Sequence, residues 1–115
     1  MKGINRVVIG GNVGQRLVFG ETKSNKIPSC SFDVCIDDGK KIVWIAVNAY
    51  GQGMVEKCRR FVQKGRYVII NGELMSRAVK DMQKIEVKAT DILVVEPAFK
   101  REEELTNKSE EQVAN

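Results

Sequence analysis

Two alternating segments joined by a short polar turn constrain the fold of this chain more than any other feature. In residues 29–36 every second side chain is apolar, which is the period of a β-strand with one buried face. Residues 42–50 fit its hairpin partner, because residues 37–41 between them carry an Asp-Gly pair that favours a tight turn. The alternation predicts two inward-facing sets, Cys30, Phe32, Val34 and Ile36 in the first strand and Val43, Ile45, Val47 and Ala49 in the second. Trp44 and Tyr50 then lie on the opposite face, exposed or partly covered.

Further strands and one helix are expected on either side of this hairpin. Residues 4–13 form a β-branched run that ends in glycines, which predicts a strand with a sharp bend. Residues 17–19 are candidates to continue its pairing. After residue 51 the apolar period becomes helical, which predicts one short helix ending near Gly65. Its inward positions are Met54, Val55, Cys58, Phe61 and Val62.

The second half of the chain is predicted to add two strands and a charged tail. Residues 67–77 form a strand with a turn or kink at Asn71-Gly72, and residues 84–95 form the last strand. In that last strand Ile85, Val87 and Ala89 alternate with Glu86 and Lys88. Five strands with one short helix between the third and fourth match the partly open Greek-key barrel called the OB-fold, so we predict an all-β domain. We expect it over residues 1–97, followed by a disordered tail over residues 98–115.

The charge balance of the predicted domain is basic. Residues 1–96 carry 16 basic and 10 acidic side chains, whereas residues 97–115 carry 3 and 5. The positive charge therefore lies on the folded part, which suits a polyanionic partner. The alternative is that the positive surface charge only keeps the protein soluble.

The residue inventory excludes most catalytic classes. The sequence has no histidine, which removes the commonest general base and the commonest zinc ligand. The glycines at 10–14 lack the spacing of a dinucleotide site, and Gly39-Lys40-Lys41 lacks the Ser or Thr of a P-loop. Asp37-Asp38 fits a turn better than a catalytic carboxylate pair. We therefore predict no catalytic residue, no metal and no cofactor.

Cysteine usage and hydropathy indicate the compartment. The three cysteines, Cys30, Cys35 and Cys58, show no CxxC spacing and lie among apolar residues, as buried thiols of a reducing compartment do. No apolar run is long enough for a signal segment or a membrane span. A cytoplasmic protein without a membrane partner is expected.

Aromatic and basic side chains are the remaining candidates for function. Single strands are held by stacking their bases on aromatic faces and by a cationic groove for the phosphates. Trp44 and Tyr50 are the predicted platforms, with burial in the core or in a subunit interface as the alternative for Trp44. Phe19 is a weaker candidate, and Phe32 and Phe61 are assigned to the core by their periodicity. The basic candidates are Lys2, Arg6, Lys40, Lys41, Lys64, Arg77, Lys80 and Lys84, near strand ends, on the outward face or in hairpin loops.

Four segments in this order resemble bacterial single-stranded DNA-binding proteins. The first is Lys2–Ile9 followed by Gly11-Asn12-Val13-Gly14, similar to the family's Asn-basic-hydrophobic run and Gly-Asn-Leu-Gly. The second is Val43–Gly51, with a Trp followed six places later by an aromatic residue and then Gly. The last two, Phe61–Val68 and Ile70–Arg77, resemble the family's Lys-Gly-x-x-Val and Gly-x-Leu-x-x-Arg segments. The resemblance spans residues 2–95.

This resemblance implies single-stranded DNA binding in replication, recombination or repair, and assembly as a homo-oligomer, a tetramer or a dimer. The family's stacking aromatics correspond to Trp44 and Tyr50, the two residues that the alternation also exposes. Its basic contacts correspond to Arg6, Lys64 and Arg77.

Several departures from the family pattern modify these expectations. The hairpin over residues 37–41 is short and lacks a further tryptophan, while Val79 and Ala46 stand where the family has an aromatic residue and an arginine. Fewer platforms predict weaker binding or a smaller site per subunit. The chain ends in Glu110–Asn115 instead of an acidic tip with Pro-Phe, so recruitment of repair proteins by that route is not expected. Such a short member suits a phage, a mobile element or an accessory replication factor.

We therefore expect a non-catalytic protein that binds and protects single-stranded DNA, largely without sequence preference, through Trp44, Tyr50 and flanking Lys and Arg. Two alternatives stay open. One is an OB-fold subunit of a primosome-like assembly, with Trp44 buried between chains. The other is a module that binds single-stranded RNA.

Overall fold

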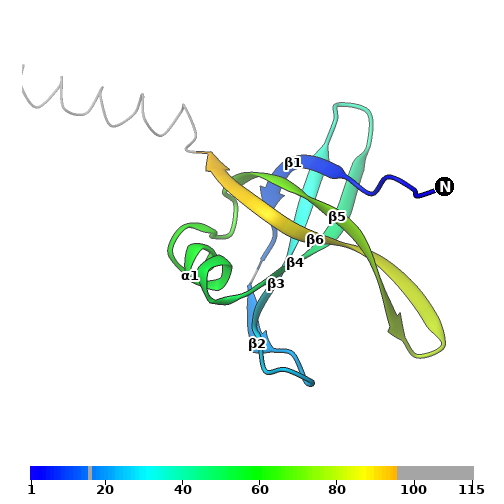
Figure 1. The fold of residues 1–115 in the computed structure, drawn as a ribbon. Coiled ribbons are helices and arrows are strands. Elements are labelled where there is room, and N and C mark those ends of the chain that lie inside the picture. The colour runs from blue at the N-terminus through cyan, green and yellow to red at the C-terminus, as the bar shows by residue number, and fades with distance from the viewer. Residues whose placement is uncertain (16, 96–115) are drawn as a thin grey trace, which may run out of the picture.

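The strands close into a barrel that is capped by one helix. The computed structural model describes residues 1–15 and 17–95. Its elements are β1 (Val7–Val13), β2 (Val18–Glu21), β3 (Pro28–Asp37), β4 (Ile42–Tyr50), α1 (Gln52–Phe61), β5 (Tyr67–Val79) and β6 (Met82–Val95). The sheet order is β1-β5-β6-β4-β3-β2, and β1 also pairs with β3, which closes the barrel. Figure 1 shows α1 at one end and the β3–β4 and β5–β6 hairpins projecting away from it.

This arrangement confirms the predicted barrel with its helix after the third long strand. β1 and β2 together occupy the place of the predicted bent first strand, so the structure has six strand segments where five strands were expected. The predicted boundary at residue 97 and the tail over residues 98–115 lie outside the described residues. In the described part of the chain, no helix is long and apolar enough to cross a membrane.

The bend in β1 lets this strand pair with both β5 and β3. Residues Val7–Asn12 pair with β5, and Asn12 and Val13 pair with Cys35 and Val34 of β3. A Cβ at Gly11 would collide with the carbonyl oxygen of Cys35, so the close approach of β1 and β3 requires glycine there. The glycine run therefore marks a barrel corner, as its sequence indicates.

The long β5–β6 hairpin forms the other side of the barrel. Its register shifts between Asn71 and Gly72, where the sequence predicted a kink. The shift is a β-bulge that leaves Thr90 without a strand partner. The Thr90 hydroxyl instead donates to the carbonyl oxygen of Asn71 at 3.0 Å. On its other edge β6 runs parallel to β4, with Val87 opposite Val47 and Lys88 opposite Asn48.

The core is built from the inward faces of five strands and the helix. Val55, Cys58 and Val62 close one end of the barrel over a centre of fully buried residues that includes Val34, Val47, Val68, Ile70, Val87 and Ile92. All three cysteines are free thiols, two of them fully buried. The contact with the Cys58 thiol and burial raise the pKa of the Cys30 thiol, which keeps it protonated and unreactive.

Two expectations about the helix are wrong. The helix ends at Phe61, four residues before Gly65, and the amide of Val62 donates to the carbonyl of Cys58 at 3.0 Å. Gly65 instead takes a positive φ of 84° in the following turn, where its amide donates to the carbonyl of Val13. Phe61 is 52% exposed, because Val62 has already left the helix and takes the inward position.

Two expected core residues on the hairpins are also exposed. Val43 lies near the tip of the β3–β4 hairpin and Ile85 near that of β5–β6, where the strands extend beyond the barrel. Glu86, expected on the solvent side, is buried together with Val87. The two neighbours point to opposite faces of the sheet, and both faces are covered at this point.

The turn between β3 and β4 is held by its aspartates, which confirms their interpretation as turn residues. The Asp37 carboxylate accepts from the amide of Gly39 at 2.9 Å. The Asp38 carboxylate accepts from the amides of Lys40 and Lys41 at 2.9 and 3.1 Å. These bonds favour the charged form, the bond from Lys40 most, and hold the pKa of Asp38 below its ordinary value of 3.8.

The Asp38 bonds should make the turn sensitive to acid. Because the folded pKa lies below the unfolded one, their stabilisation is fully present above about pH 3.8 and is lost as the pH falls through the folded pKa. We expect a carbon-13 NMR titration to give an Asp38 midpoint below 3.8. Asp38→Asn should remove this step from the acid dependence of stability. A midpoint at or above the ordinary value would show that the turn bonds do not form in solution.

Candidate nucleic-acid interface

The outward face of the β3–β4 hairpin brings the predicted aromatic platforms into one row. The strand register places Trp44, Ala46, Asn48 and Tyr50 of β4 opposite Cys35, Asp33, Ser31 and Ser29 of β3. Because directly paired residues project from the same side of a sheet, these eight residues form one surface, here called the strand face. Trp44 is 60% exposed and Tyr50 is half-buried, as the alternation predicted.

Trp44 is held in place from below by the connection after β1. A Cβ added at Gly14 would lie 3.0 Å from Cζ3 of the indole, so the ring packs directly over this glycine. The amide of Gly14 in turn donates to the carbonyl of Asp33 at 2.8 Å. An exposed indole that rests on fixed backbone is a rigid surface for stacking.

Tyr50 is positioned from the β5–β6 side. Its hydroxyl lies 3.9 Å from the sulfur of Met75. The Lys88 ammonium lies 6.0 Å from the centre of the Tyr50 ring, within the range of a cation–π contact. Lys88 was missing from the sequence-based candidates, although its alternation with Val87 and Ala89 placed it outward. The missing information was the pairing of β6 with β4, which brings Lys88 beside Asn48.

The β5–β6 hairpin extends the strand face with cationic side chains. Arg77 pairs with Lys84 across the hairpin, and Met75 pairs with Glu86. Lys88 lies beside Asn48, Arg77 reaches Glu86, and Lys84 lies further along the hairpin toward its tip. The assignment of Arg77 and Lys84 as nucleic-acid contacts stays a prediction.

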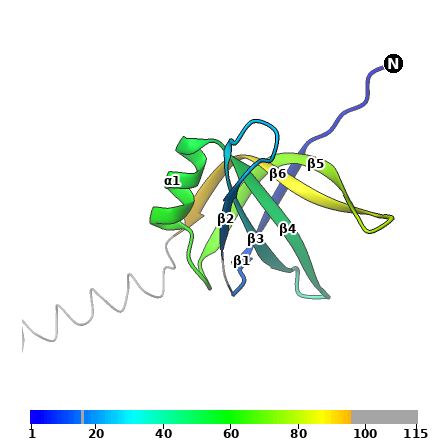
Figure 2. The ribbon, with the colours of Figure 1, turned by 90° about the horizontal axis from the view of Figure 1, so that it is seen from below.

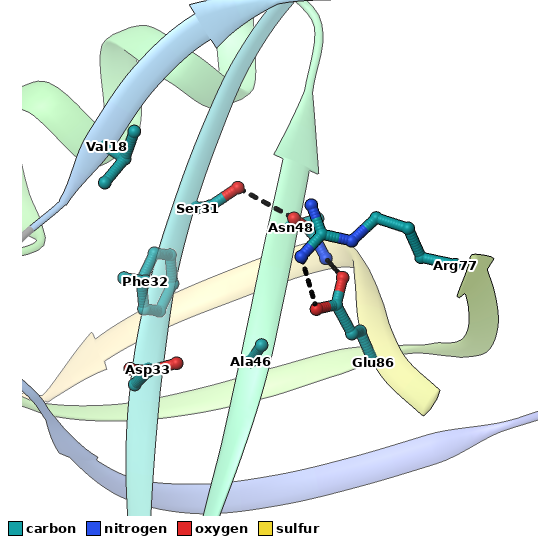
Figure 3. Close-up of a pocket in the computed structure, with 8 residues that line it drawn as sticks. All are labelled: Val18, Ser31, Phe32, Asp33, Ala46, Asn48, Arg77 and Glu86. Carbon is teal, nitrogen blue, oxygen red and sulfur yellow. Dashed lines mark hydrogen bonds and ion pairs between the residues drawn. The ribbon is translucent and has the colours of Figure 1, made fainter. Parts of the chain in front are cut away.

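A chain of hydrogen bonds crosses the centre of the strand face (Figure 3). The Ser31 hydroxyl donates to Asn48 Oδ1 at 2.7 Å, and Asn48 Nδ2 donates to Glu86 Oε1 at 2.9 Å. Arg77 Nη2 donates to Glu86 Oε2 at 3.1 Å. The Glu86 side chain is 5% exposed and that of Arg77 is 56% exposed. The network therefore anchors the guanidinium at one end and leaves much of it open to solvent.

The same groups border a depression of about 400 Å³, here called the central hollow. It is lined by Val18, Ser31, Phe32, Asp33, Ala46, Asn48, Arg77 and Glu86. Neither the hollow nor its polar network was predicted from the sequence. No group of three or more side chains in the described residues is arranged to hold a metal ion.

The remaining basic candidates lie at different distances from this surface. Lys40 and Lys41 lie in the β3–β4 turn, and Lys80 lies in the β5–β6 turn, at the tips of the two projecting hairpins (Figure 2). All three are exposed. Lys2 and Arg6 precede β1, and Lys64 lies between α1 and β5, so none of these three belongs to a strand of the face.

Phe19, the weaker stacking candidate, does not lie in the platform row. It pairs with Cys30, a core-facing residue, whereas its neighbour Val18 pairs with Ser31 of the strand face. The guanidinium of Arg59 from α1 lies 4.3 Å from the centre of the Phe19 ring. Arg59 thus covers an aromatic ring on the helix side of the barrel.

An OB-fold barrel with aromatic and basic side chains across one strand face has the architecture of a single-strand-binding module. The model of the Single-strand binding protein family matches residues 4–99. The chain belongs to this family.

Individual relatives agree with that assignment. The chain is 29% identical over 89 residues to Single-stranded DNA-binding protein 2 of Chlorobaculum tepidum, a match covering 70% of this chain. The chain spans about 60% of the length of this relative. A Plasmodium falciparum SSB solved in complex with ssDNA has a TM-score of 0.70 at 19% identity, covering 84% of this chain and 98% of the other. The SSB domain of a Synechococcus protein has a TM-score of 0.63 at 15% identity, covering 80% and 97%. Both structures confirm the fold.

Proposed function

We propose that this protein binds single-stranded DNA without catalysis and protects it from re-pairing and from nucleases. The observation that carries the proposal is the strand face, where Trp44 and Tyr50 lie in one row with Lys88 and Arg77 beside it. Bases stack on the two aromatic rings while the phosphates follow the cationic edge. Stacking is tolerant of sequence because every base has a π-face.

Several further properties belong to the same proposal. Lys40, Lys41 and Lys80 on the hairpin tips provide additional phosphate contacts where the strand leaves the face. Lys2, Arg6 and Lys64 contribute to the longer-range positive field. Family membership and the exposed apolar side chains Val8, Leu74 and Leu93 support a homo-oligomer. The free, buried thiols support a cytoplasmic setting.

A fluorescence titration with oligo-dT tests the function directly. Trp44 is the single tryptophan of the chain, so its emission reports the strand face alone. We expect strong quenching on binding, with log K falling against log salt concentration by about 0.7 for each phosphate contacted. Binding of oligo-U in preference to oligo-dT would instead identify an RNA-binding module. No quenching and no retarded complex would point to a protein-assembly role.

A further inference from the structure

The central hollow occupies the middle of the proposed stacking row. Along β4, Ala46 and Asn48 lie between Trp44 and Tyr50, and Ala46 is too short to fill the space beneath its neighbours. The volume of about 400 Å³ is ample for one base and lies within the range of small-molecule pockets, about 300–1,000 Å³. A strand that stacks on both aromatics passes over this opening.

The polar groups on the inner side of the hollow are fixed. The Asn48 amide donates to Glu86 and lies 3.7 Å from the Met75 sulfur, while its oxygen accepts from Ser31. Asn48 and Glu86 are both buried. Because each is held by its neighbours, these groups keep one orientation and do not need to reorganise when a ligand enters.

The open side of the hollow presents donors and acceptors from two different strands. The Arg77 guanidinium uses Nη2 to reach Glu86 and has further N–H groups on its exposed part. Asp33 projects from β3 beside Ala46 and is exposed (Figure 3). Within the described residues, no hydrogen bond or ion pair engages the Asp33 side chain. A cation therefore borders the hollow on one side, and a carboxylate with no partner among the described residues borders it on the other.

This combination favours a base over a phosphate and one base over the others. Asp33 and Glu86 repel the negatively charged backbone from the hollow. Guanine has two adjacent N–H donors at N1 and N2, which match a carboxylate, and two acceptors at O6 and N7, which match an arginine fork. Thymine and uracil have a single ring N–H donor, while adenine and cytosine each present one amino group beside ring acceptors.

We propose that the central hollow is a base pocket selective for guanine, in which Asp33 accepts from N1 and N2 and Arg77 donates to O6 and N7. The inference rests on the proposed binding of single-stranded DNA to the strand face. It adds a specificity-determining residue, Asp33, to a surface whose stacking is otherwise tolerant of sequence.

Competition experiments with repeat oligonucleotides test this pocket. The full chain is titrated with d(TTG), d(TTA), d(TTC) and oligo-dT repeats of equal length, in lithium buffer to prevent guanine quadruplexes. We expect d(TTG) repeats to bind at least about fivefold more tightly than oligo-dT, the effect of one bidentate contact. Repeats with inosine for guanine, which lack the 2-amino group, should lose part of this preference.

Two variants connect the preference to the hollow. Asp33→Asn should reduce the ratio of d(TTG) to oligo-dT affinity several-fold, because the amide presents an NH2 donor where the carboxylate presents its second acceptor oxygen. Glu56→Gln removes one exposed carboxylate from α1, away from the strand face, and should leave the ratio unchanged. Equal affinity of the wild-type protein for d(TTG) and oligo-dT, or a ratio unaffected by Asp33→Asn, would overturn the pocket and leave the proposed function intact. Failure to bind any of the oligonucleotides would overturn the proposed function itself.

Discussion

Replacing Trp44 with alanine should weaken binding of oligo-dT by about 1–3 kcal/mol, which is roughly 5- to 150-fold in Kd. The indole is the most exposed aromatic ring on the strand face and is supported from below by Gly14. The variant therefore loses a preformed stacking surface while the barrel retains its buried core. Fluorescence anisotropy of a labelled oligonucleotide measures the change, since the variant has no tryptophan to quench.

Phe61→Ala is the matched control for this experiment. Phe61 has a similarly exposed aromatic ring but lies at the end of α1, outside the strand face. Its replacement should leave the oligo-dT affinity unchanged. Trp44→Phe should recover part of the lost affinity, because a smaller ring still stacks. If Trp44→Ala and Phe61→Ala had equal effects, base stacking on Trp44 would be excluded.

A second large effect is expected on stability rather than binding. Ile70 is fully buried near the start of β5, where it pairs with Ile9 of β1 and Ile92 of β6. Ile70→Ala should reduce the free energy of unfolding by about 2–5 kcal/mol, because it removes buried methyl groups and leaves a cavity among three strands. Urea denaturation followed by circular dichroism gives the change, provided that the m-value stays constant.

Ile85→Ala provides the comparison at an exposed position. Ile85 lies on the projecting part of β6 and is 54% exposed, so its truncation should change the free energy of unfolding by no more than about 0.5 kcal/mol. A loss as large as that of Ile70→Ala would show that this hairpin is covered in solution. Measuring both variants over a range of protein concentrations would then reveal whether another copy of the chain covers it.

The parts of the molecule that follow from local periodicity could be predicted from the sequence. The two-residue alternation of β4 correctly exposed Trp44, and the Asp-Gly pair correctly located the hairpin turn. Periodicity says which side of an element a residue faces, but it does not say where the element leaves the barrel. Phe61 and Ile85 were assigned wrongly for this reason.

The central hollow could not be predicted, because it depends on contacts between distant strands. Asn48 and Glu86 are 38 residues apart and meet through the short parallel pairing of β4 with β6. No local pattern encodes that register. The face that Phe19 takes could likewise not be predicted, because the pairing of β2 with β3 decides whether Val18 or Phe19 turns toward the strand face.

The double pairing of β1 has a consequence for how the chain is made. The β3–β4 hairpin joins neighbouring segments and can form once Tyr50 has left the ribosome, whereas β1 pairs with β5 as far along the chain as Gly72. Until β5 leaves the ribosome, one edge of β1 has unpaired backbone amides and carbonyls that another nascent chain could capture. The stacking hairpin is thus produced first and the β5 partner of β1 later. The time needed to translate residues 51–72 therefore sets the interval in which the new chain is most open to misassembly.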